Sequence, residues 1–177
     1  HPRLLRYRHS QEFLHRVENS AFAEFRSSSR RYVDTVQMQD SWDYLAAMQH
    51  FGVATRLLDW TTELDVALYF AVGALTKVDM ADPSSWPCIW VLNPFKLNNL
   101  LVNDDVIFDR ADAIPYDYYS ATVECIKNGA NWPHETPIAI NPGFSNPRIE
   151  AQHGRFTVHG ANLHALGDGL NPVSGFW

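Results

Sequence analysis

The sequence predicts an α+β fold in which N-terminal helices precede a mixed or antiparallel sheet. Apolar residues at helical spacing dominate the first part of the chain, whereas short apolar runs with strand character lie mostly later. This order differs from the regular alternation of strands and helices that builds a parallel sheet. The chain has 177 residues, 46% of them hydrophobic, so we expect a single domain over 1–177.

Two helices are predicted at the N-terminal end. Residues 11–34 repeat apolar side chains at helical intervals, and a break, if there is one, is expected near Asn19. A shorter helix is expected to begin after an N-cap at Ser41. It should end at Gly52, because glycine tolerates the left-handed backbone that closes many helices.

A strand that runs directly into a helix is predicted next. Residues 55–60 have strand character, and Thr61 or Thr62 is expected to cap the following helix. Two carboxylates would then lie in its first turn, where the helix dipole favours negative charge. Apolar residues occupy more than one face of this helix as far as residue 71, so we expect it to be buried on most sides.

Three further segments have strand character: 88–92, 138–140 and 148–158. The last of them is interrupted at Gly154. Residues 96–137 give a poor signal, with some helical character over 118–127. The Gly, Asn and Pro content after Gly160 predicts an irregular tail over 161–177.

Charge is distributed unevenly along the chain. The net charge is +4 over residues 1–31 and −10 over the rest. Seven arginines lie in the basic part: Arg3, Arg6, Arg8, Arg16, Arg26, Arg30 and Arg31. They form either the solvated face of a helix or a surface for phosphates or an acidic partner. A long basic patch of the kind that binds duplex nucleic acid is not visible.

Several functional classes lack their sequence signals. No run of about 18 apolar residues occurs, so no membrane span is expected. Cys88 and Cys125 stand in no metal or redox spacing, which favours a reduced, cytoplasmic compartment. No zinc-protease, serine-hydrolase, P-loop or dinucleotide-binding motif is present, and we expect no metal site. Because the chain begins with His1 rather than Met, we expect it to be a piece of a longer protein.

The most informative segment, 49–61, carries more hydrogen-bonding side chains than a core strand needs. Its candidate site residues are Gln49, His50, Arg56, Asp59, Trp60 and Thr61. The free N–H groups of the next helix offer an anion site, and an arginine can hold a phosphate with two hydrogen bonds. Asp59 would accept hydrogen bonds from ribose hydroxyls or an amide. In the alternative, Arg56 and Asp59 pair or cap the helix, and His50 only interacts with the carbonyls that end its own helix.

A second polar cluster lies in the predicted strand 148–158. If this segment is extended, Arg148, Glu150 and Gln152 point to one face, because side chains alternate along a strand. Three polar groups on one face resemble a ligand site. The alternative is an exposed strand face that carries an Arg–Glu pair.

These motifs together resemble the FRG domain family. The resemblance rests on Gln49-His50-x-Gly52-x-x-Thr55-Arg56-Leu57-Leu58-Asp59-Trp60-Thr61, on Val66-Ala67-Leu68-Tyr69-Phe70-Ala71, on Ile89-Trp90-Val91-Leu92-Asn93-Pro94, on Pro137-Ile138-Ala139-Ile140, and on Arg148-Ile149-x-x-Gln152-x-Gly154-x-Phe156. It covers roughly residues 1–158. The aromatic-Arg-Gly triplet that names the family is missing, since Tyr7-Arg8-His9 matches it poorly. We expect that triplet to lie upstream of His1.

The family pattern is similar to that of ADP-ribosyltransferases, which implies a fold of that kind with NAD as the substrate. By this analogy Asp59-Trp60-Thr61 takes the position of the second motif, and Glu150 or Gln152 that of the third. Arg56 would hold phosphates and Trp60 would stack on a ring. The resemblance also implies a toxin or phage-defence effector that has a protein or nucleic-acid acceptor, or an antitoxin protein as its partner.

Two alternatives to such a transferase remain. The chain is a non-catalytic module that recognises a nucleotide or a protein, in which case the polar groups of segment 49–61 satisfy one another. Or it is an RNA nuclease with His50 as its base and His153 as the second catalytic group.

Overall fold

The computed structural model describes residues 2–6, 9–29, 38, 40–73, 82, 86–103, 105–108, 127–128, 137–141 and 147–160. Its elements are a 3₁₀ turn Leu4–Arg6, α1 Gln11–Ser28, α2 Ser41–His50, β1 Leu57–Thr61, α3 Leu64–Val72, α5 Pro94–Val102, β2 Ile138–Ile140, α7 Pro147–Ala151 and β3 Gly154–Val158. In these parts of the chain no helix is both long enough and apolar enough to cross a membrane.

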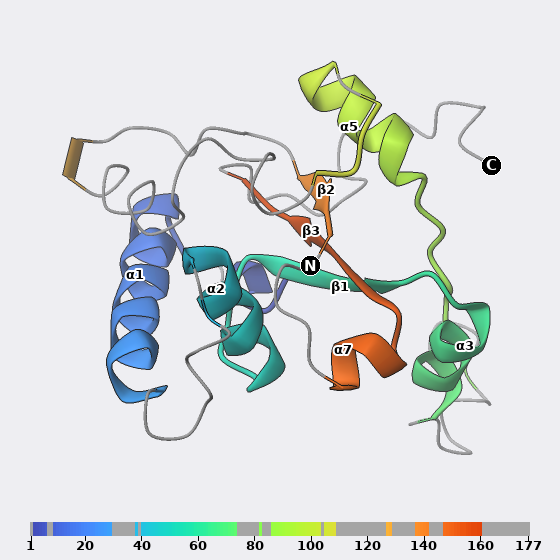
Figure 1. The fold of residues 1–177 in the computed structure, drawn as a ribbon, viewed down its shortest axis with the longest axis horizontal. Coiled ribbons are helices and arrows are strands. Elements are labelled where there is room, and N and C mark those ends of the chain that lie inside the picture. The colour runs from blue at the N-terminus through green and yellow to red at the C-terminus, as the bar shows by residue number, and fades with distance from the viewer. Residues whose placement is uncertain are drawn as a thin grey trace.

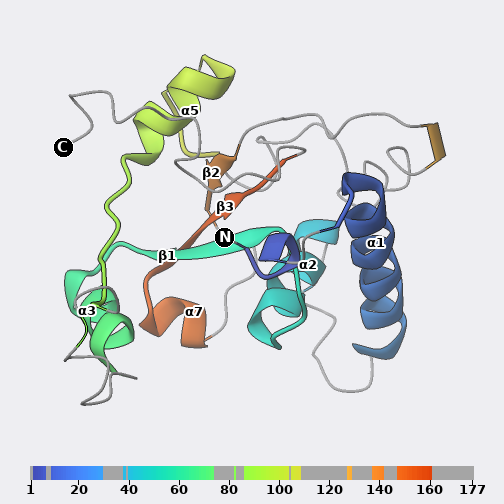
Figure 2. The same cartoon turned by 180° about the vertical axis from the view of Figure 1, so that it is seen from behind.

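An antiparallel sheet of three strands lies at the centre, in the order β1-β3-β2. Leu57 and Ile138 both lie opposite Val158 in the register. Helices α1 and α2 stand side by side at one end of the molecule, and α3 stands at the opposite end of β1 (Figures 1 and 2). The predicted α+β class, with N-terminal helices ahead of an antiparallel sheet, is therefore confirmed.

The hydrophobic core lies between one face of this sheet and the helices α1 and α2. Its larger members are Phe22, Met38, Trp42, Leu45, Met48, Leu57, Ile138, Ile140, Phe156 and Val158. Strand alternation explains the sheet's share, because Phe156 and Val158 stand two residues apart and point to the same side. The side chains of β3 between them point to the other face of the sheet, away from this core.

The two N-terminal helices begin at side-chain caps. Ser10 accepts a hydrogen bond from the Phe13 N–H at the start of α1. Asp40, rather than the predicted Ser41, is the N-cap of α2, and it forms a capping box with Asp43. α1 runs through Asn19 without a break. α2 ends at His50 with Phe51 as its C-cap, and Gly52, which was predicted to close the helix, follows with a left-handed φ of 80°.

A buried ion pair joins α1 to the start of β1. Glu18 and Arg56 are 0% and 2% exposed. The Glu18 carboxylate accepts hydrogen bonds from the Arg56 Nε at 2.8 Å and from the Arg56 backbone N–H at 3.2 Å. Arg56 also donates to the carbonyl of His159 and accepts a hydrogen bond from the His159 N–H. α1, β1 and the end of β3 are thereby fixed together.

Three predictions of local structure are wrong. α3 has no buried residue, although it was expected to be buried on most sides. Residues 88–92 form no strand, and Trp90 and Val91 are 75% and 80% exposed. Segment 148–158 is not one strand but the helix α7 followed by β3. The break falls at His153, whose φ of 46° cannot continue a strand.

Sequence reasoning also missed α5, which is attached to β2 by one buried side chain. Asn98 is fully buried, and its amide exchanges hydrogen bonds of 2.8 and 2.9 Å with the N–H and C=O of Ala139. This amide takes the place of a neighbouring strand. The predicted tail over 161–177 and nearly all of the predicted helix over 118–127 lie outside the described residues.

We predict that Glu18→Gln lowers the free energy of unfolding by about 3–5 kcal/mol, because it leaves the Arg56 guanidinium buried without its carboxylate. Chemical denaturation measures this loss. Glu12→Gln is the matched control on the same helix, since the exposed Glu12–Arg16 pair should contribute only about 0.5 kcal/mol. Equal losses for the two variants would contradict the importance of the buried pair.

Candidate functional site

A cavity of about 420 Å³ opens beside the face of the sheet that turns away from the core. We call it the Trp60 cavity. Its lining comes from the β1–α3 junction, the extended segment 89–92, and β2 and β3: Trp60, Thr61, Thr62, Glu63, Leu64, Ala67, Ile89, Trp90, Val91, Leu92, Pro94, Ile107, Ala139, Ile140, Arg155, Phe156 and Thr157. Its volume lies within the range of small-molecule sites, about 300–1,000 Å³.

The strand register places an aromatic ring and a cation at this cavity. Trp60 lies opposite Arg155, and Leu58 lies opposite Thr157. Alternation therefore puts Trp60, Arg155 and Thr157 on one face, while Val158 points into the core. The Arg155 side chain is partly buried and donates one hydrogen bond to the carbonyl of Gly154 at 2.8 Å.

A short chain of hydrogen bonds runs behind the indole. The Trp60 Nε1–H donates to the Thr157 hydroxyl at 3.0 Å, and this hydroxyl lies 3.3 Å from His159 Nε2. Burial, together with the positive charge of Arg56, lowers the pKa of His159 from 6.5 to about 4. The imidazole is therefore neutral at physiological pH.

The rim of the cavity is formed where β1 runs into α3. The Thr61 hydroxyl donates to the Gln152 carbonyl at 2.7 Å and accepts a hydrogen bond from the Glu63 N–H at 3.1 Å. The helix begins at Leu64, and its N-cap is Glu63 without a side-chain hydrogen bond, one or two residues later than the predicted Thr61 or Thr62. The Glu63 carboxylate lies 3.8 Å from His153 Nδ1. The rim thus carries a carboxylate, and the first N–H groups of α3 begin beside the cavity.

Four predicted site residues lie away from this cavity. Arg56 is buried against Glu18, so its guanidinium supports the sheet. Gln49 donates to the Asp59 carboxylate at 2.7 Å and accepts from the Thr55 hydroxyl at 2.6 Å. The polar side chains of this network bind one another, as the alternative interpretation of segment 49–61 expects. His50 lies at the end of α2, where its ring contacts Phe51.

The predicted polar face of 148–152 does not form. α7 covers Pro147–Ala151, so Arg148, Glu150 and Gln152 do not alternate as in a strand. Glu150 is exposed, and Gln152 is half-buried and contributes its carbonyl to Thr61. Neither residue lines the cavity. The side chain of Arg148 lies outside the described residues.

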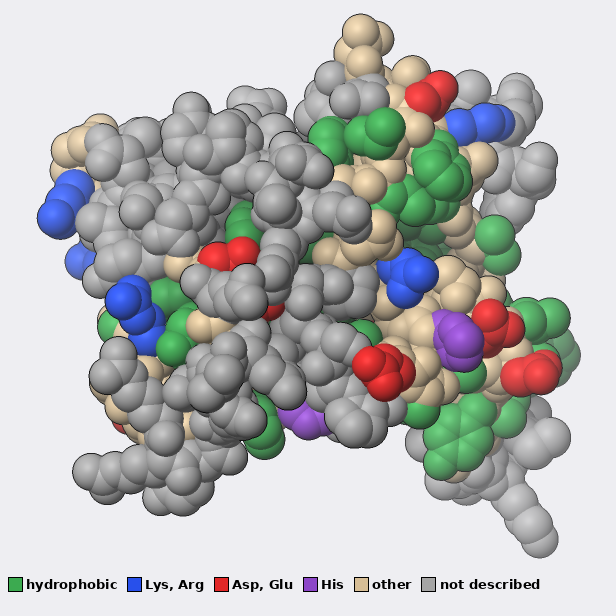
Figure 3. Space-filling view, viewed as in Figure 1, with side chains coloured by type: hydrophobic (Ala, Val, Ile, Leu, Met, Phe, Trp, Pro, Cys, Tyr) green, Lys and Arg blue, Asp and Glu red, His purple; other side chains and the backbone are tan. Residues whose placement is uncertain are grey.

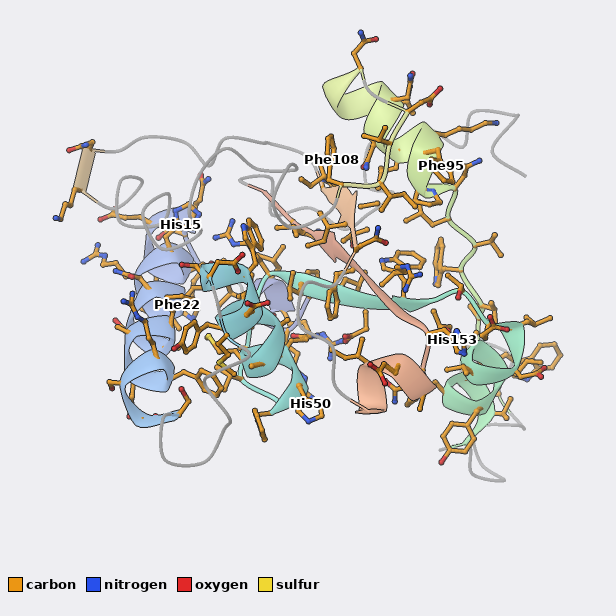
Figure 4. The ribbon with its side chains drawn as sticks, viewed as in Figure 1. His15, Phe22, His50, Phe95, Phe108 and His153 are labelled. Atoms are coloured by element: carbon orange, nitrogen blue, oxygen red, sulfur yellow. The ribbon has the colours of Figure 1, made fainter. Side chains whose placement is uncertain are left out.

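Segments 49–61 and 148–158 lie side by side over part of their length, because β1 pairs with β3 along its whole length. Of the predicted site residues, the cavity holds Trp60 and Thr61. Sequence reasoning missed Glu63, Arg155 and Thr157 as site residues. The signal was there in the Arg-Phe-Thr-Val run after Gly154, which alternates polar and apolar residues. His50 and His153, the pair proposed for RNA cleavage, lie at separate places, one at the end of α2 and the other beside α3 (Figure 4).

Some of the apolar side chains that line the cavity are largely exposed. Leu64, Trp90 and Val91 are 64%, 75% and 80% exposed. Figure 3 shows hydrophobic side chains at the surface over α3 and over α5. Among the described residues no group of three or more His, Cys, Asp or Glu side chains is placed to hold a metal ion. The site is therefore an apolar cavity with a tryptophan, a cation and a rim carboxylate.

The cavity-lining residues of β1 and of the start of α3 belong to a segment that matches a known family. The family model of the FRG domain matches residues 1–80. Over residues 1–80 the chain is similar to the FRG domain family. The match confirms the resemblance that rests on Gln49–Thr61 and Val66–Ala71, and it does not extend to β2 and β3. No curated protein and no solved structure matches the chain.

We predict that stability falls as the pH drops below about 6.5. Burial lowers the pKa of His15 as well as that of His159 from 6.5 to about 4, so the unfolded chain binds these two protons at a higher pH than the folded chain does. Stability is complete above pH 6.5 and declines towards pH 4, by up to about 1.4 kcal/mol per pH unit for each histidine. Urea denaturation between pH 7.5 and 5 measures this slope.

His15→Gln should remove about half of that slope. An unfolding free energy that stays constant between pH 6.5 and 5 would show that the two imidazoles are not held neutral in the fold.

Proposed function

We propose that this FRG-type domain binds NAD in the Trp60 cavity and cleaves the bond between nicotinamide and ribose. The observation that carries the proposal is the placement of Trp60 and Arg155 opposite each other on one sheet face, at a cavity of about 420 Å³. An indole offers a stacking surface for a nucleotide base or a nicotinamide ring. A guanidinium holds phosphate oxygens with paired hydrogen bonds.

The start of α3 favours the same ligand class. The N-terminal N–H groups of a helix carry partial positive charge and bind anions. Leu64, the first residue of α3, lines the cavity together with Thr61 and Thr62. A pyrophosphate between Arg155 and this helix end would leave the ring of the ligand beside Trp60 and Trp90.

The proposed reaction breaks the bond between ribose C1′ and the nicotinamide nitrogen. Nicotinamide leaves as a neutral molecule, and an oxygen or nitrogen nucleophile of water or of an acceptor attacks the cationic ribose carbon. The proton of the nucleophile passes to Glu63, the carboxylate at the cavity rim. Gln152 contributes only its carbonyl, which accepts a hydrogen bond from the Thr61 hydroxyl at the rim.

We propose that the chain has an ADP-ribosyltransferase-like fold, as the resemblance to the FRG family implies. We propose that the chain acts in the cytoplasm as a toxin or phage-defence effector whose acceptor is a protein or a nucleic acid. The second candidate is a non-catalytic nucleotide- or protein-recognition module. One observation favours it: Glu150 and Gln152, which the family resemblance suggested for catalysis, lie outside the cavity lining.

We predict that Arg155→Gln weakens NAD binding about 10- to 100-fold, because it removes a charged hydrogen-bond donor to phosphate. Calorimetric titration and the NAD-dependent rise in melting temperature both measure the loss. Arg16→Gln on the exposed face of α1 is the matched control and should bind NAD like the wild type. Absence of a thermal shift in millimolar NAD for the wild-type protein would contradict the proposal.

We predict that Glu63→Gln abolishes product formation and leaves NAD affinity within a few-fold of the wild type. The carboxamide keeps the shape of the side chain but cannot accept the proton. Mass spectrometry after incubation with NAD and a mixture of protein and nucleic-acid acceptors detects the products. The Gln152→Ala variant is measured in the same assay. If the wild type binds NAD but releases neither nicotinamide nor a modified acceptor, the recognition module is the correct function.

A further inference from the structure

We propose that Thr157, with His159 behind it, is a positioning residue that fixes the plane of the Trp60 indole at the cavity wall. The inference rests on the proposed function, since it assigns the stacking surface for the ring of the nucleotide. Thr157 and His159 do not take part in the bond cleavage. Their effect reaches the ligand through Trp60.

The direction of the hydrogen bonds follows from the chemistry of the three side chains. An indole N–H can only donate, so the Thr157 hydroxyl accepts from Trp60 at 3.0 Å. The hydroxyl then has its own hydrogen left for His159 Nε2, 3.3 Å away. A neutral imidazole accepts this hydrogen at Nε2 and carries its proton on Nδ1. Threonine therefore bridges a pure donor to an acceptor.

Burial makes this bridge rigid. Thr157 and His159 are each 1% exposed, so no bulk water competes for the hydroxyl. Trp60 is half-buried and lines the cavity, so its ring has a fixed edge and an open side. A tryptophan free to rotate would lose side-chain entropy on stacking, whereas a ring held beforehand would not.

The buried imidazole of His159 destabilises the fold, which indicates a role other than packing. Within the described part of the chain, the buried Nδ1 of His159 has no hydrogen-bond partner. A buried donor without a partner destabilises a fold, and an apolar residue would avoid this cost. In return, the ring supplies an acceptor at Nε2 that orients the Thr157 hydroxyl towards the indole.

The test compares Thr157→Val with Thr157→Ser. Valine keeps the shape but removes the hydroxyl, and it should weaken NAD binding about 3- to 10-fold, the effect of one hydrogen bond. Serine restores the hydroxyl and should restore the affinity. Ribose 5-phosphate, which carries the phosphate and no aromatic ring, should bind all three proteins equally. Equal affinity of the valine variant and the wild type for NAD would overturn the proposal.

A second comparison separates positioning from general damage to the fold. In Trp60→Phe the ring has no N–H, so a further Thr157→Val change should cause no additional loss of NAD affinity. If the two losses add, Thr157 does not act through Trp60 and the proposal fails.

The positioning role also has a readout without NAD. The indole N–H signal in the nuclear magnetic resonance spectrum, assigned by its disappearance in Trp60→Phe, should exchange slowly with water in the wild type and at least tenfold faster in Thr157→Val. If NAD fails to bind but this exchange pattern is observed, the proposed ligand is wrong, whereas Thr157 still fixes the indole. Fast exchange in the wild type would overturn the fixed indole itself.

Discussion

The buried pair of Glu18 and Arg56 is the interaction on which the rest of the structure depends. It lies where α1, the start of β1 and the end of β3 come together, and its hydrogen bonds reach the backbone of Arg56, just before β1, and of His159, just after β3. A charge buried this completely is tolerated only with its partner in place. The pair therefore fixes where β1 begins, and with it which side chains of β1 face α1 and α2 and which face away.

Because side chains alternate along β1 and β3, the two faces of the sheet have different roles. One face gives Leu57, Phe156 and Val158 to the core. The other gives Trp60, Arg155 and Thr157 to a cavity closed by α3 and segment 89–92. A shift of one residue in the pairing of β1 with β3 would exchange the two sets, because side chains alternate with a period of two. Stability and the shape of the Trp60 cavity thus depend on the same register.

Local signals in the sequence predicted much of this arrangement, and long-range contacts account for the rest. The predicted N-cap of α2 lies one residue from the observed Asp40, and Gly52 follows the end of this helix as expected. Ile138–Ile140 is a strand, also as expected. The apolar pattern of α3 predicted burial, but no described element covers that helix. The role of Arg56 depended on Glu18, 38 residues away, which no local pattern reveals. For 148–152, Pro147 at the start of a helix outweighed the alternation, since proline suits the first helical turn.

The proposed function requires that a nucleotide binds on the sheet face of Trp60 and not around segment 49–59. Chemical-shift mapping with isotope-labelled protein and NAD distinguishes the two places, because the two sets of residues lie on separate faces. We expect the largest shifts at Trp60, Glu63, Arg155 and Thr157, which line the cavity. Shifts centred on Gln49, His50 and Asp59, with the Trp60 indole unchanged, would contradict it.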